Sequence, residues 1–111
     1  MAVVDIAKSG GLYSYIGLSA SDTGEPLFLG GGWGVFMCVT AASGGGSGFN
    51  SGTLTIQVSN DGTNWATLKD IHGTDVTFTA TGTFELSTAA KYIRASCDAS
   101  ISDVDVYFNF G

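Results

Sequence analysis

The chain has 111 residues, of which 44% are hydrophobic and only 13% are charged. This length suits one domain with a modest core, and the charged share is about half of that in an average soluble protein. Ten Asp and Glu against four Lys and Arg give a net charge of −6. Nucleic acid and anionic membrane surfaces are therefore disfavoured as partners, because both attract basic groups.

Two further features bear on location and partners. The longest apolar run, residues 35–39, is too short to span a bilayer, and Asp5 and Lys8 interrupt the start where a secretion leader would be apolar. We therefore expect a soluble protein made in a cytoplasm. With so few charges, much of its neutral surface is expected to be covered by other subunits.

The first segment, residues 1–11, has no turn residues before its glycines and contains a weak strand pattern. We predict that it belongs to a single domain of residues 1–111 and is able to lie as an arm along a neighbouring subunit. Its apolar residues Val3, Val4 and Ile6 are then candidates for an interface.

The segment 12–18, LYSYIGL, alternates in the manner of a strand with one buried face. The pattern predicts Leu12, Ile16 and Leu18 toward the core and Tyr13 and Tyr15 outward. The two outward tyrosines are candidates for an interface.

The segment 33–40, WGVFMCVT, is apolar on both faces. Either it is a central strand covered on both sides, or its second face meets a partner. The second alternative adds Trp33 and Phe36 to the candidate interface.

Three later runs, residues 53–59, 91–97 and 103–110, alternate clearly and predict strands. Their inward positions are Leu54, Ile56, Val58, Ile93, Ala95, Cys97, Val104, Val106, Phe108 and Phe110. Weaker strand patterns lie at residues 2–7, 66–70, 75–80 and 83–87, and Asp61-Gly62 predicts a hairpin turn at residues 59–64. The whole predicts an all-β antiparallel β-sandwich of about eight strands, jelly-roll-like in its rhythm.

The sequence contains no pattern that predicts catalysis or a metal site. His72 is the only histidine and lies in a loop between Asp70 and Asp75, without a nucleophile motif. Cys38 and Cys97 are too few for a zinc site, and they are either free thiols or a bridge. The aspartates near the C-terminus lack the calcium-loop pattern. We expect no enzyme activity, no metal and no cofactor.

Aromatic side chains leave a binding role open. The candidates for stacking on a sugar are Tyr13, Tyr15, Trp33, Trp65 and Tyr92. Against this, Trp65 starts the return strand of its hairpin and is expected to pack into the core. Trp33 suits either the core or an interface.

Two segments resemble a known family: LTIQVSNDGTNWATL at residues 54–68 and KYIRASCDASISDVDVYFNF at residues 91–110. The S-x-D-G-x-x-W and Y-I-R-A motifs, with GGWGVFMCV before them, are similar to those of small phage head-decoration (capsid cement) proteins, over Leu27 to Phe110. The resemblance implies a sandwich on the outer capsid surface, often a homotrimer, with the major capsid protein as partner, made in a bacterial host. The alternative is a carbohydrate- or receptor-binding module of a phage tail or fibre.

Overall fold

The structure of the chain is a computed structural model. It describes residues 3–9, 12–29, 36–42, 48–50, 52–70, 72–86, 88 and 90–109, and within these it describes the side chains of all but residues 9, 36–42 and 84–86. The described residues form strands and turns and no helix, so the predicted all-β class is confirmed. None of them forms a helix long and apolar enough to cross a membrane.

The described strands outnumber the eight predicted, because five of them have only two residues. In chain order they are β1 (Val3–Val4), β2 (Ile6–Ser9), β3 (Leu12–Leu18), β4 (Thr23–Gly24), β5 (Leu27–Phe28), β6 (Phe36–Ala42), β7 (Leu54–Ser59), β8 (Ala66–Thr67), β9 (Thr77–Phe78), β10 (Gly82–Leu86), β11 (Tyr92–Cys97) and β12 (Val104–Asn109).

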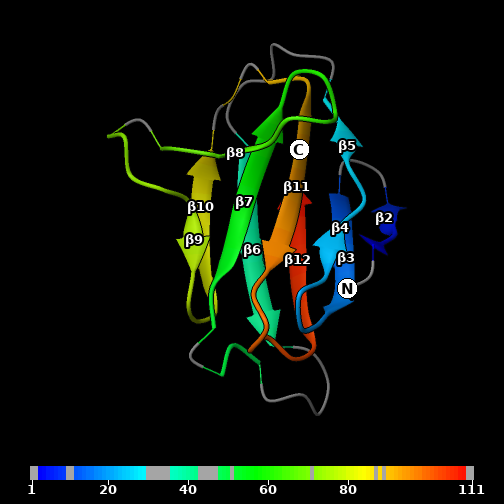
Figure 1. The fold of residues 1–111 in the computed structure, drawn as a ribbon, viewed down its shortest axis with the longest axis vertical. Coiled ribbons are helices and arrows are strands. Elements are labelled where there is room, and N and C mark those ends of the chain that lie inside the picture. Colours follow the sequence, from blue (N-terminus) through cyan, green and yellow to red (C-terminus); the bar gives the residue numbers. More distant parts are fainter. Residues whose placement is uncertain are drawn as a thin grey trace.

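The strands pair into two sheets (Figure 1). A seven-stranded sheet has the order β1-β4-β11-β7-β8, with β5 also paired to β11 and β9 to β7. A five-stranded sheet has the order β10-β6-β12-β3-β2. In Figure 1 the green β7 and orange β11 cross in front of the teal β6 and red β12. The pairings are antiparallel except for the parallel pair of β1 and β4.

Both sheets contribute to one hydrophobic core. Leu54 and Ile56 of β7, Ile93 of β11, and Val106 and Phe108 of β12 are all fully buried. The inward positions predicted for these three strands are therefore confirmed over their described residues, whereas Ser59 and Asp105, predicted to face outward, are buried as well. Because each sheet packs one face on the core and exposes the other to solvent, polar residues lie at every second position of these strands.

The alternation predicted for β3 is confirmed at Leu18 and wrong on the other side of Gly17. Tyr15 is fully buried together with Leu18, whereas Ile16 is 51% exposed and Leu12 is 36% exposed. Tyr13, also predicted to face outward, is half-buried and packs against the core.

An irregularity in the pairing of β3 with β12 explains the change of face. Leu18 pairs with Val104, but the next partners are Tyr15 and Val106, so β3 carries one extra residue at this point. Gly17 lies in this bulge with a φ of 74° and donates its N–H to the Asp105 carboxylate over 2.8 Å. Such a bulge reverses the strand's facing, because side chains alternate with a period of two.

Tyr15 links the two sheets. Its ring packs edge-on against Phe108 with centroids 6.0 Å apart, and its hydroxyl donates a hydrogen bond to the carbonyl oxygen of Glu25. Gly24 of β4 lies so close to the ring that a Cβ atom there would overlap it. Glycine is therefore required at this position for Tyr15 to reach across the core.

The described part of the predicted arm, residues 3–9, pairs within its own chain. β1 pairs with β4, β2 pairs with β3, and Glu25 accepts the Ile6 N–H over 3.0 Å. β2 forms one edge of the five-stranded sheet.

Candidate functional site

Charged residues are concentrated outside the strands. Of the fourteen Lys, Arg, Asp and Glu residues, the described strands contain Lys8, Glu85, Arg94 and Asp105. Arg94 is the one charge in the strands of the seven-stranded sheet. The outer face of that sheet therefore offers a partner a neutral surface with a single cation.

Aromatic side chains gather around this cation on the outer face of the seven-stranded sheet. Tyr92 pairs with Phe28 of β5, and their ring centroids are 5.2 Å apart with the planes tilted by 58°. Phe28 is 62% exposed and, together with Tyr92, forms an exposed aromatic pair. We call Phe28, Trp65, Tyr92 and Arg94 the aromatic–cation surface.

Trp65 and Arg94 form the second half of this surface. The guanidinium carbon lies 4.1 Å from the centroid of the Trp65 ring, within the range of a cation–π interaction. The Arg94 Nε–H donates to Gln57 Oε1 over 2.8 Å, which fixes the plane of the guanidinium. Burial lowers the pKa of Arg94, but an arginine stays protonated in a protein, so the positive charge is kept.

The turn between β7 and β8 positions Trp65. The Asp61 carboxylate accepts the backbone N–H groups of Thr63 and Asn64, each over 2.8 Å, and the Asn64 side-chain amide over 2.7 Å. Ser59 donates its hydroxyl to Asp61, and its oxygen accepts the Gly62 N–H. These donors, led by the backbone N–H of Asn64, lower the pKa of Asp61 far below its usual value.

A cavity of about 210 Å³ opens beside the same turn. It is lined by Val58, Ser59, Asn60, Asn64, Ala66 and Ala90. Asn60 and Asn64 are both exposed and bring two side-chain amides to the cavity, of which Asn64 already donates to Asp61 within the turn.

The predicted interface residues lie in different environments. Val3 is 64% exposed, whereas Val4 and Ile6 are partly buried against the core. Tyr13 is half-buried, with the Lys8 ammonium 5.7 Å from its ring centroid. The structure therefore brings these four residues to the side of the core near β2 and not to the aromatic–cation surface.

The other three predicted interface residues have different outcomes. Tyr15 is fully buried in its own core, so its ring is not available to a partner. Trp33 lies outside the described residues, and so does the side chain of Phe36, whose backbone begins β6.

Phe28 was not among the predicted site residues, although the run Leu27-Phe28-Leu29 before three glycines indicates that it faces outward. Three successive apolar residues in a strand cannot all face one core, so the middle one must point outward. Arg94 and Tyr92 follow from the alternation of residues 91–97, which places both on the outer face. Trp65 does not join the core cluster as predicted, because Arg94 holds it at the surface.

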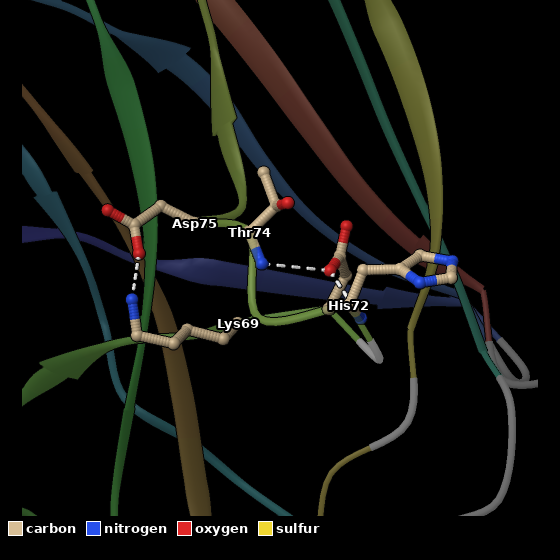
Figure 2. Close-up of polar contacts among 5 residues, drawn as sticks. Lys69, His72, Thr74 and Asp75 are labelled. Atoms are coloured by element: carbon tan, nitrogen blue, oxygen red, sulfur yellow. Dashed lines mark hydrogen bonds and ion pairs between the residues drawn. The ribbon is translucent and has the colours of Figure 1, made fainter.

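His72 is exposed, and side-chain contacts within its own loop hold that loop in place (Figure 2). Asp70 accepts the N–H groups of His72 and Thr74 over 2.9 and 3.0 Å, and Lys69 pairs with Asp75. In Figure 2 the imidazole extends away from the Lys69–Asp75 pair. These contacts indicate that Asp70 and Asp75 serve to form the turn.

Asp98 and Cys97 are two further groups with chemically reactive side chains. Asp98 accepts the N–H groups of Thr53 and Ser100 over 2.7 and 3.0 Å. Within the described part of the chain, no three His, Cys, Asp or Glu side chains are grouped so that they could hold a metal ion. Cys97 is free, and burial, together with the nearby Asp22 and Asp98 carboxylates, raises the pKa of its thiol to about 12.

Comparison of the chain with protein-family models, with curated proteins and with solved structures found no match.

Proposed function

We propose that the chain is a non-catalytic structural protein of a phage virion, which binds the outer surface of the capsid and stabilises it. The observation that supports this most is the aromatic–cation surface, where the exposed Phe28 packs against Tyr92, and Trp65 packs against Arg94 of the same strand as Tyr92. Trp, Tyr and Arg are the residues that contribute most of the binding energy in protein interfaces.

The sequence supports the capsid as the partner. The S-x-D-G-x-x-W and Y-I-R-A motifs resemble those of head-decoration proteins, and three of the four surface residues, Trp65, Tyr92 and Arg94, belong to them. With this role we propose a jelly-roll-like sandwich as the fold, a homotrimer as the assembly, and the outer capsid surface as the location after synthesis in a bacterial host. A single core to which both sheets contribute is compatible with that fold.

The mechanism in this proposal is thermodynamic. Contacts made only with the assembled shell stabilise that shell by mass action and oppose its disassembly. Several copies that are joined to one another and to the shell would bind more tightly than one copy, because each later contact is intramolecular.

Sugar binding is the second candidate, and the cavity beside Asn60 together with the Tyr92 ring favours it. Two features of the surface weigh against it. Arg94 already covers one face of the Trp65 ring, and the 58° tilt between Phe28 and Tyr92 does not provide a flat platform for a pyranose. A protein surface, which is irregular, fits this arrangement better.

The test is co-sedimentation with empty, expanded capsids of the phage whose genome encodes the chain. We expect Phe28→Ala to weaken binding by about 2 kcal/mol, or roughly thirtyfold in Kd, as for a central interface residue. Ile16→Ala is the matched control, because Ile16 is similarly exposed on the other sheet. Failure of the wild-type chain to sediment with capsids, combined with glycan binding that Tyr92→Ala abolishes, would favour the sugar-binding candidate instead.

A further inference from the structure

Arg94 presents its hydrogen-bond donors in a direction that its own chain fixes. Its Nε–H donates to Gln57, the residue directly opposite on β7, and the Trp65 ring covers one face of the guanidinium. The plane of the guanidinium is therefore set before a partner binds. A side chain that is already oriented loses less freedom on binding than a flexible one.

The two terminal nitrogens of this guanidinium have no partner within the described part of the chain. Among the residues that the structure describes, the hydrogen bond to Gln57 is the only one that Arg94 makes, and no carboxylate forms an ion pair with it. Lys69, by contrast, pairs with Asp75. The chain has ten acidic residues, so Arg94 does not lack a partner because acids are scarce. Its terminal N–H groups have the geometry to bind both oxygens of one carboxylate.

An apolar surface lies at a defined distance from these nitrogens. Tyr92 precedes Arg94 by two residues on β11 and faces the same way, which separates the two side chains by about 7 Å along the strand. The Tyr92 ring packs against the exposed Phe28. A Cβ atom at Gly62 would lie 3.6 Å from the same ring, so the turn between β7 and β8 supports Tyr92 as well. A ligand with an anion on Arg94 therefore also reaches an aromatic pair.

Charge indicates which kind of anion fits. The chain has a net charge of −6, and Arg94 is the one charged residue in the strands of this sheet. Polyanions are disfavoured, because they are bound by many cations together. A phosphate monoester carries nearly two negative charges at neutral pH, whereas a carboxylate carries one and is repelled less. The favoured ligand is therefore a single carboxylate with an apolar group beside it.

We propose that the aromatic–cation surface binds an extended protein segment in which an acidic residue and a large apolar residue are two positions apart. The acidic side chain accepts hydrogen bonds from the terminal nitrogens of Arg94, and the apolar side chain packs on Phe28 and Tyr92. Two positions along an extended chain span about 7 Å and return to the same face, which matches the spacing of Arg94 and Tyr92. The inference rests on the proposed function for the identity of the partner and adds the chemistry that the partner presents.

The experiment titrates the isotope-labelled full chain with two acetylated and amidated tripeptides, Phe-Ser-Glu and Phe-Ser-Gln. NMR signals of the Arg94 Nε–H and the Trp65 indole N–H report the binding. We expect the glutamate peptide to bind at least about tenfold more tightly, because a charge-assisted hydrogen bond is stronger than a neutral one. Equal affinities overturn the proposal, and so does tighter binding of Phe-Ser-phosphoserine or of a methyl sialoside, since either would identify a different anion source.

Two substitutions that remove the same charge separate a specific contact from general electrostatics. Arg94→Gln should weaken binding of the glutamate peptide by at least about tenfold, and Arg94→Lys by nearly as much, because lysine lacks the planar fork. Lys91→Gln is the matched control, at an exposed residue just before β11, and should change the affinity by less than about twofold. Equal losses in Arg94→Gln and Lys91→Gln contradict the proposal. If Arg94→Gln is misfolded, the two peptides still decide the question on the wild-type chain.

Capsid co-sedimentation separates this inference from the proposed function. A chain that binds the glutamate peptide as expected but does not bind capsids supports the inference and refutes the capsid role alone. Capsid binding that is unchanged in Arg94→Gln refutes the inference alone.

Discussion

The outer faces of the two sheets differ in the environment of the charged residue that each contains. Each face has a single charged residue in its central strands: Arg94 on the seven-stranded sheet, and Asp105 on the five-stranded sheet. Arg94 rests on the Trp65 ring at the surface, where a partner can reach it. Asp105 is buried and bonded to Gly17 and Tyr107 of its own chain.

The two faces therefore differ in whether a partner can reach the charged group. A guanidinium that stacks on a ring still presents its charge and N–H donors to a partner. A buried carboxylate that already accepts hydrogen bonds from its own chain presents neither. The aromatic–cation surface therefore offers a partner an accessible cation, whereas the charge on the outer face of the five-stranded sheet is held inside the chain.

The largest expected effect comes from a change that should affect both faces together. Gly24→Ala would push a Cβ atom into the Tyr15 ring, which is held by Phe108 and by its hydrogen bond to Glu25. Overpacking of this kind costs about 1–3 kcal/mol of unfolding free energy. Chemical denaturation measures the loss, and capsid binding should weaken with it.

Gly82→Ala is the control for Gly24→Ala, because a Cβ atom there meets Phe78 at an ordinary 3.5 Å. Unchanged stability in Gly24→Ala would mean that Tyr15 does not join the sheets rigidly.

A smaller effect is expected at Gly17, and it should be confined to the five-stranded sheet. Gly17 has a φ of 74°, and a Cβ atom there would meet Asp103 Oδ1 at an ordinary 3.9 Å, so Gly17→Ala costs backbone strain of about 1 kcal/mol and no clash. A strained bulge would weaken the pairing of β3 with β12, and the amides of these two strands should exchange faster with solvent. Gly17→Asn is the control, since asparagine tolerates positive φ better. Equal losses in both variants would point to a lost contact and not to backbone strain.

The same bulge marks the limit of what the sequence predicts. The alternation of residues 54–59, 92–97 and 104–109 correctly identifies the core positions of β7, β11 and β12, because regular pairing keeps the period of two. In β3 the pattern fails at Ile16 and Tyr15, since one extra residue reverses the facing. The sequence contains Gly17 as a hint, but the partner strand decides where a bulge forms.

The candidate surface was predictable only in part. Tyr92 and Arg94 follow from alternation within one strand, whereas Phe28 joins them by pairing between β5 and β11, which are far apart in the chain. The two-residue strands β4 and β5 are too short for any periodic signal, although β4 contains the Gly24 on which Tyr15 packs. Long-range pairing therefore determines both the surface and the link between sheets.

The smallest expected effect is a pH dependence confined to the turn under the aromatic–cation surface. Hydrogen bonds from Asn64, Thr63 and Ser59 hold the pKa of Asp61 well below its ordinary 3.8. A depressed pKa in the folded state means that the unfolded chain binds the proton more readily. The stabilisation by Asp61 is therefore fully present above pH 3.8 and is lost as the pH falls from there toward the folded pKa.

Amide hydrogen exchange of Gly62 and Asn64, followed by NMR down the acid range, measures this loss. We expect the turn to loosen only below pH 3.8, while the amides of β3 and β12 keep their protection until global unfolding. Asp61→Asn isolates the effect from other carboxylates, including Asp70, because it removes the titrating group and should abolish the local pH dependence. Loosening of the turn at a higher pH would mean that these hydrogen bonds are not formed, and would leave Trp65 without the support that positions it against Arg94.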